Sequence, residues 1–238
     1  MNRDSSYSHP LAPGLRLDGR LVLWVENERT LVAADLHLGY AWAHRHGGQL
    51  LPISGRDDTV ERLGALAEGY GAAQVVLLGD IVHRAVPVPA IREEVEELAK
   101  RLEAVTVRWI AGNHDRGLEA FLPGVRIERE VVIGPHLLTH GAEEDGDAAV
   151  ACLSRLNEGG WLIMGHEHPA IHLHDGVTTS VKCPCFIAGA RVLVLPAFSP
   201  WAAGTNVRGG AFMSAYAQGE SFSHAYAVLG GRILAVRL

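Results

Sequence analysis

The sequence predicts an α/β protein built from two mixed β-sheets that pack face to face, with helices on their outer sides. In the first half of the chain, short apolar runs alternate with amphipathic stretches, and after Val125 short apolar runs follow one another. The chain has 238 residues, of which 48% are hydrophobic, so it can bury a full core. Its length fits a single domain spanning residues 1–238.

The first half is predicted to hold four strands and two helices. The strands are Leu21 to Val25, Thr30 to Ala34, Gln74 to Leu78 and Val105 to Ile110, and the helices are Arg56 to Glu68 and Ile91 to Leu102. The first two strands form a hairpin. Val60, Leu63 and Leu66 recur at helical spacing, which indicates one buried face on the first helix.

The second half is predicted to form the second sheet. Its strands are Val131 to Val132, Leu137 to Thr139, Trp161 to Met164, Ile171 to Leu173, Val192 to Leu195 and Ala225 to Leu229. One helix, about Asp147 to Asn157, interrupts them. Phe198 to Gly210 carries Pro, Gly, Ser and Asn and is predicted to be an irregular loop. This arrangement places polar strand ends along one rim, where ligands usually bind.

Charge and composition limit the function classes. The net charge of −6 gives no overall basic field, so a nucleic acid must be held locally. Scattered arginines are candidates for that contact, namely Arg45, Arg56, Arg155, Arg191 and Arg208. Three cysteines build no disulfide framework, and neither a signal peptide nor a membrane span is evident. We therefore expect a soluble, cytoplasmic protein.

Ligand-type side chains follow five apolar strands directly. The five groups are Asp35 with His37, Gly79-Asp80, Gly112-Asn113, Thr139-His140, and Gly165-His166-Glu167-His168. Asp-x-His alone is a weak signal, and alternation along a strand predicts that both side chains point the same way. A carboxylate after a buried strand is costly unless a cation neutralises it. Five such strand ends together favour a metal site over a chance arrangement.

The ligand set predicts two metal ions. It mixes carboxylate, amide oxygen and imidazole without a thiolate, which suits Mn²⁺, Fe, Zn²⁺ or Mg²⁺, with Mn²⁺ expected first. Seven ligands are too many for one ion. Two ions about 3.5–4 Å apart that share a carboxylate are a usual arrangement for hydrolysing phosphate esters.

These blocks, in this order, resemble the signature of the calcineurin-like metallophosphoesterases. The resemblance spans Asp35 to His168 and implies a four-layer α/β/β/α sandwich. It implies Asp35, His37 and His168 on one metal, Asn113, His140 and His166 on the other, and Asp80 as the bridging, catalytically essential ligand. It further implies that a metal-bound hydroxide attacks phosphorus and that His114 is the catalytic acid for the leaving oxygen.

Flanking motifs are similar to a small prokaryotic branch that includes the ligase-associated DNA-damage-response phosphoesterases. They are Leu36 to Tyr40, Leu51 to Ser54, Gly165 to Ile171, Lys182 to Phe186 and Leu195 to Phe198. This resemblance implies a phosphodiesterase or nuclease whose substrate is a phosphodiester in single-stranded or damaged DNA, or in a nucleotide. A hydrolase of small phosphate monoesters or pyrophosphates and a metal-binding scaffold remain as alternatives, and a homodimer remains open.

The sequence leaves two possible roles open for several residues near these blocks. His83 either orients His114 or reaches the substrate phosphate, or else it is a hydrogen-bonded buried histidine. Arg84 either clamps a phosphate oxygen or lies on the surface. Asp115 either supports a metal ligand from behind or caps a helix that starts near Arg116, and capping is the commoner role of Asp at such a position. His44 and His46 are expected in a polar loop, where they either contact the substrate or are simply exposed, and His172 and His174 are expected on a solvated strand face.

Overall fold

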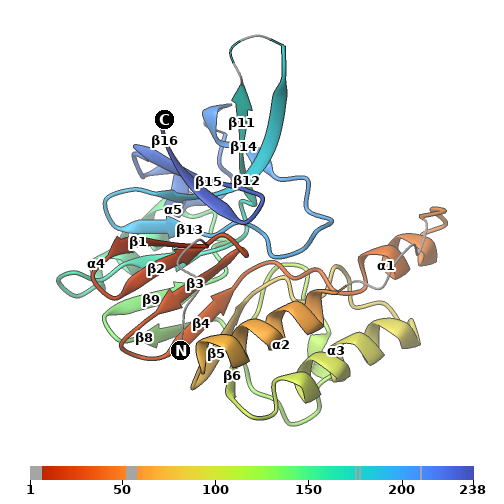
Figure 1. Ribbon diagram of the computed structural model, residues 1–238. Coiled ribbons are helices and arrows are strands. Elements are labelled where there is room, and N and C mark those ends of the chain that lie inside the picture. Colours follow the sequence, from red (N-terminus) through yellow and green to blue (C-terminus); the bar gives the residue numbers. More distant parts are fainter. Residues whose placement is uncertain (1–6, 52–57, 175, 177, 210) are drawn as a thin grey trace.

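The first sheet is made by the N-terminal half of the chain in a computed structural model that describes residues 7–51, 58–174, 176, 178–209 and 211–238 (Figure 1). Its strands lie in sequence order. They are β1 (Ser8–Ala12), β2 (Leu15–Asp18), β3 (Val22–Val25), β4 (Thr30–Ala33), β5 (Gln74–Leu78), β6 (Thr106–Ile110) and β7 (Ile127–Glu128). The hairpin of β3 and β4 pairs Leu23 with Val32, whereas β4, β5 and β6 run parallel.

The second sheet is made by the C-terminal half. Its strands are β8 (Glu130–Ile133), β9 (His136–Thr139), β10 (Leu162–Met164), β11 (Pro169–His174), β12 (Ser180–Ala188), β13 (Val192–Val194), β14 (Thr205–Asn206), β15 (His224–Leu229) and β16 (Arg232–Arg237). Strands β9, β10 and β13 are parallel, and the remaining pairings are antiparallel except for β11 with β14. Figure 1 shows β11 and β12 extending away from the body of the molecule.

Alternation along the central strands places the two sheets face to face. In β5, Val75 and Leu77 belong to the core beneath the helices, whereas Val76 and Leu78 belong to the core between the sheets. In β10, Ile163 faces that same inter-sheet core. Strands buried on both faces read as continuous apolar runs, which explains why these segments were visible in the sequence.

Helices cover the outer faces of both sheets. The first sheet carries α2 (Thr59–Tyr70) and α3 (Pro89–Arg101), which lie side by side in Figure 1. The second sheet carries α4 (Gly146–Ser154) and α5 (Ala215–Gln218), which share a core with β10, β12 and β15. The predicted fold class, two mixed sheets flanked by helices, is confirmed.

Some elements differ from the sequence prediction. Helix α1 (Tyr40–His46) replaces the predicted polar loop, and strands β1, β2, β7, β12, β14 and β16 were not predicted. Short 3₁₀ helices span Leu118–Ala120 and Val207–Gly209. Of the flanking motif Leu51 to Ser54, only Leu51 lies among the described residues, and Arg56 lies outside them. Among the described helices, none is long and apolar enough to span a membrane.

Candidate metal centre

Seven ligand-type side chains meet where parallel strands of both sheets end. Asp35 follows β4, Asp80 follows β5 and Asn113 follows β6 in the first sheet. His140 and His166 follow β9 and β10 in the second. The backbone joins these ends, since Asp35 N donates to Gly79 O at 3.1 Å and Gly165 N donates to His140 O at 3.0 Å.

The first group of side chains consists of Asp35, His37, Asp80 and His168. Their ligand atoms all lie within 4.8 Å of one another. His37 Nε2 is 3.2 Å from His168 Nε2, which in turn is 3.4 Å from Asp35 Oδ1. Two carboxylates and two imidazoles at this separation form a donor set suited to one divalent cation.

The second group surrounds His140 Nε2. This nitrogen is 3.0 Å from Asn113 Oδ1, 3.2 Å from His166 Nδ1 and 3.5 Å from Asp80 Oδ1. Asp80 therefore contributes to both groups and lies between them. The structure brings all seven candidate ligands together.

The hydrogen-bonding pattern of His140 fits a cation in the second group. His140 Nδ1 faces the carbonyl oxygen of Leu78 at 3.2 Å, and a carbonyl only accepts, so Nδ1 carries the hydrogen. The lone pair of Nε2 then faces the amide oxygen of Asn113 and the carboxylate of Asp80. A positive ion among these atoms turns a repulsive cluster of lone pairs into a set of ligands. The donor sets of both groups fit divalent metal ions.

Burial also sets the protonation of the site. Burial lowers the pKa of His37 to about 3 and the pKa of His166 to about 4, so both imidazoles are in the neutral form that binds metal. Burial would raise the pKa of Asp35, but the imidazoles of His168, His140 and His37 hold it below its usual value. Burial raises the pKa of Asp80, against the opposing effect of His140. A cation favours the ionised form of both carboxylates.

Backbone strain is concentrated at the ligands. Among the described non-glycine residues with positive φ, five are candidate ligands: Asp35 (55°), His37 (48°), Asp80 (46°), His166 (69°) and His168 (44°). Left-handed conformations of such residues cost about 1–3 kcal/mol each and occur mainly at functional sites. The expected alternation of Asp35 and His37 along a strand is therefore wrong. Strand β4 ends at Ala33, and a left-handed backbone aims both side chains.

The glycines before the ligands provide space rather than only turning the chain. A Cβ on Gly112 would lie 2.1 Å from Asp80 Oδ1, and a Cβ on Gly165 would lie 2.6 Å from Asp35 Oδ2. Each glycine thus lets one strand end approach the carboxylate of another. This close approach was not visible in the sequence.

His114 lies at the open side of the centre. Its backbone N–H donates to Asp80 Oδ1 at 2.9 Å, and its ring Nε2 is 3.9 Å from Asp80 Oδ2. Nδ1 donates to the carbonyl of His83 at 2.7 Å, which fixes the orientation of the ring. The side chain is 38% exposed, so a substrate can reach Nε2.

The structure shows the surroundings of three neighbours for which the sequence left two possibilities open. Asp115 caps no helix; it accepts hydrogen bonds from Val82 N at 3.0 Å and Gly112 N at 2.8 Å, and its burial raises its pKa to about 6. His83 is not a hydrogen-bonded buried histidine, because its ring is partly exposed and its Nδ1 has no partner among the described residues. Its backbone carbonyl, not its ring, orients His114. Arg84 is exposed beside it.

Glu167 is a residue whose role the sequence did not reveal. It is 2% exposed, and its Oε1 accepts the backbone N–H groups of Met213 at 2.9 Å and Ser214 at 2.6 Å. Burial raises its pKa. Because Glu167 lies between His166 and His168, it ties a distant segment to two candidate ligands. Its position in the Gly165–His168 block was the only signal.

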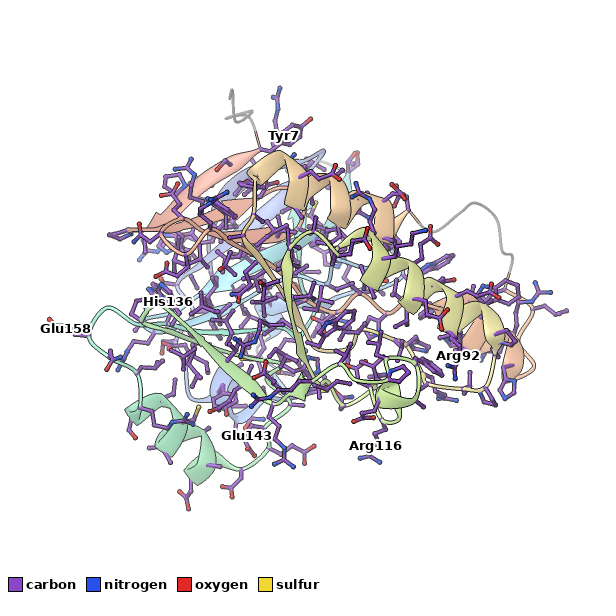
Figure 2. The ribbon with its side chains drawn as sticks, turned by 90° about the horizontal axis from the view of Figure 1, so that it is seen from below. Tyr7, Arg92, Arg116, His136, Glu143 and Glu158 are labelled. Atoms are coloured by element: carbon purple, nitrogen blue, oxygen red, sulfur yellow. The ribbon has the colours of Figure 1, made fainter. Side chains whose placement is uncertain are left out.

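Two hollows flank the centre. One, of about 210 Å³, is lined by His168, Lys182, Ser199 and Gly204 among others. The other, of about 290 Å³, is lined by Asn113, Arg129, His140 and Glu143, the last of which is labelled in Figure 2. Among the scattered arginines, Arg155 pairs with Glu130, and Arg191 donates to the carbonyl of Asn157. These two are engaged within the chain.

Comparisons with known proteins agree with this geometry. Residues 28–133 match the family model of the calcineurin-like phosphoesterases. The crystal structure of Pseudomonas putida nuclease MPE has the same fold, with a TM-score of 0.67 and 24% identity over 93% of this chain and 94% of that chain. A comparison with curated proteins found no match. Residues 28–133 of this chain thus resemble the calcineurin-like phosphoesterases, and the chain as a whole shares the fold of the Pseudomonas putida nuclease.

Proposed function

We propose that the chain is a dinuclear phosphodiesterase that hydrolyses phosphodiester bonds of DNA or of nucleotides. The observation that carries this proposal is the position of Asp80 between two groups of ligand-type side chains. Asp35, His37 and His168 would complete one metal site, and Asn113, His140 and His166 the other. Oxygen and imidazole donors without thiolate support Mn²⁺ as the ion.

Two divalent ions at such a site supply an activated water and neutralise the charge of the phosphate. The protein residues hold the reacting groups in place. Asp80 accepts the backbone N–H of His114 and thereby fixes the acid relative to both metal sites. The buried carboxylate of Asp35 is held by the backbone N–H of His166 at 3.1 Å.

His114 supports a catalytic rather than a scaffold function. The carbonyl of His83 keeps a proton on Nδ1, so the second proton of the imidazolium lies on Nε2, which faces the centre. From there it can pass to the leaving oxygen as the ester bond breaks. A metal-binding scaffold needs no such group.

The net charge of the chain favours a short or single-stranded phosphodiester as substrate. The net charge of −6 provides no broad basic surface for a long duplex. The similarly folded Pseudomonas putida protein is described as a nuclease, which agrees with a phosphodiester substrate. Arg84 beside the site can contact a phosphate oxygen.

The proposal is tested with purified protein, Mn²⁺ and bis-p-nitrophenyl phosphate. We expect hydrolysis that depends on the metal, together with two metal ions per chain by elemental analysis. The monoester p-nitrophenyl phosphate should be a poorer substrate. A faster reaction with the monoester would support the phosphomonoesterase alternative, and bound metal without any turnover would contradict an enzymatic function.

A further inference from the structure

A cluster of flat rings lies beside the metal centre and is not explained by it. The rings of Tyr40 and Trp201 are stacked, with centroids 5.4 Å apart and planes 4° apart. The ring of His44 stacks on that of His83 at 4.9 Å and 21°, and Tyr40 contacts both imidazoles at 4.4 and 4.5 Å. We call Tyr40, His44, His83 and Trp201 the ring platform.

The ring platform leads directly to the candidate acid. The centroid of His83 is 5.4 Å from that of His114. A continuous row of rings therefore runs from Trp201 through Tyr40 and His83 to His114. The centroid of His114 is in turn 5.3 Å from that of the candidate ligand His37, so this row of rings ends at the metal centre.

The backbone under the platform is tied to the metal ligands. Tyr40 begins α1 three residues after His37, and Gly39 N donates to Glu94 Oε2 at 2.7 Å. The loop that carries Trp201 is joined to the first ligand strand, because Ser199 N donates to Asp35 O at 3.2 Å. These hydrogen bonds anchor both parts of the platform next to the candidate metal ligands.

Core packing does not account for these rings. The core aromatic residues Trp24 and Phe198 are at most 1% exposed, whereas all four platform residues are partly exposed. Aromatic rings at a solvent boundary next to a phosphate site are the usual means of binding unpaired nucleobases, because each base has a face that can stack.

We propose that the ring platform stacks an unpaired nucleobase of the nucleotide adjacent to the scissile phosphate. This inference rests on the proposed phosphodiesterase function and names its substrate class as single-stranded nucleic acid or a nucleoside phosphodiester. A base in a duplex is paired and stacked inside the helix, so it does not reach the platform. Stacking also suits a chain of negative net charge, since it requires no broad basic surface.

The test compares two esters that release the same p-nitrophenolate. One is thymidine 5′-(p-nitrophenyl phosphate), and the other is the matched ester whose deoxyribose carries no base. With the Mn²⁺-loaded protein, we expect kcat/KM to be roughly 5- to 150-fold higher for the ester with the base. The matching ester of uridine extends the comparison to a ribonucleoside.

Variants show whether the platform causes this preference. Trp201→Ala and Tyr40→Leu should bring the ratio of the two kcat/KM values close to one, whereas Trp201→Phe, which keeps a flat ring, should retain most of it. Phe222→Ala is the matched control, because Phe222 packs on Phe212 at a hollow that none of the candidate ligands lines. Its ratio should equal that of the unmodified protein.

The outcomes separate this inference from the proposed function. Equal hydrolysis of both esters by the unmodified protein overturns the inference alone. An undiminished preference in both Trp201→Ala and Tyr40→Leu, with metal content intact, overturns it as well. Failure to hydrolyse either ester with metal bound defeats the proposed function and the inference together.

Discussion

At the scale of single residues, the proposed catalytic role of His114 can be tested separately from metal binding. Its ring Nδ1 is held by the carbonyl of His83, and its Nε2 faces the centre. Removing the ring leaves the candidate ligands in place. The proposed function therefore predicts that the metal sites survive when the leaving-group acid is lost.

We predict that His114→Ala lowers kcat by about 10²–10⁴-fold while two metal ions remain bound. Turnover of bis-p-nitrophenyl phosphate and elemental analysis of the same sample measure both effects. His172→Ala, at a partly exposed imidazole on β11, is the matched control and should leave both values unchanged. Activity of the His114 variant within twofold of the unmodified protein would remove His114 from the mechanism.

Glu167 provides a second test at the residue scale. Its carboxylate holds the backbone of Met213 and Ser214 next to two candidate ligands. Residues that orient ligands in this way typically contribute 10–100-fold to metal affinity. We expect Glu167→Ala to weaken Mn²⁺ binding by about this factor, as measured by titration against a competing chelator.

The conservative change Glu167→Gln keeps one oxygen acceptor for the two N–H groups. It should therefore retain more of the metal affinity than Glu167→Ala. If both variants bind Mn²⁺ as tightly as the unmodified protein, the segment at Met213 does not support the metal centre.

At the scale of elements, strand β9 gives a prediction about pH. His136 begins β9, at the opposite end of the strand from His140. In Figure 2 it is labelled on the left, whereas Arg92 on α3 is labelled on the right. It is 5% exposed, and its Nδ1 accepts the backbone N–H of Trp161 at 3.2 Å. Burial lowers its pKa, so the folded protein favours the neutral ring.

The unfolded chain binds a proton at His136 more readily than the folded protein does. The stabilisation provided by the neutral ring is therefore complete above the unfolded pKa of about 6.5. That contribution is lost as the pH falls from there toward the lower pKa of the folded state. His136→Asn keeps an acceptor but does not titrate. We expect the unmodified protein to lose stability relative to this variant by up to about 1.4 kcal/mol per pH unit below pH 6.5.

Urea unfolding of both proteins in the presence of chelator measures this difference. The other histidines titrate in both chains, so their effects cancel in the comparison. A difference in unfolding free energy that stays constant between pH 5 and pH 8 would contradict the assignment of His136 as a buried neutral ring.

The elements that the sequence predicted are those with a strong apolar period. Strands β4 and β10 are fully buried, and so are most residues of β5 and β9 and the last two residues of β6. Each strand was recognisable as a short apolar run that stops at a polar group. Helix α1 was missed, because Tyr40–His46 is too short to show an apolar period and lies between two glycines. Its position depends on contacts with α3 and with His83, which are distant in sequence.

The identities of the candidate ligands were predictable, but the way the backbone presents them was not. Left-handed φ values at Asp35, His37 and Asp80 depend on the surrounding fold and contradict local preference. The role of Asp115 is similar, since its partners Val82 and Gly112 lie on two different strand ends. Capping a helix is the more frequent role of an Asp at such a position, but the carboxylate of Asp115 accepts hydrogen bonds from these two distant segments instead.

At the scale of the whole molecule, the metal centre joins the two sheets. Asp35, Asp80 and Asn113 come from the first sheet, whereas His140 and His166 come from the second. Metal that binds only the folded state must therefore stabilise the packing of one sheet on the other. In the proposed site, two bound ions would offset both the strained ligand backbone and the facing lone pairs, so the proposal depends on two ions that share Asp80.

The most direct measurement is the anomalous diffraction of crystals grown with Mn²⁺. We predict two manganese peaks about 3.5–4 Å apart, one on each side of the carboxylate of Asp80. Crystals of Asp80→Asn should show weakened or missing peaks. A single peak, or two peaks that do not share Asp80, would contradict the account.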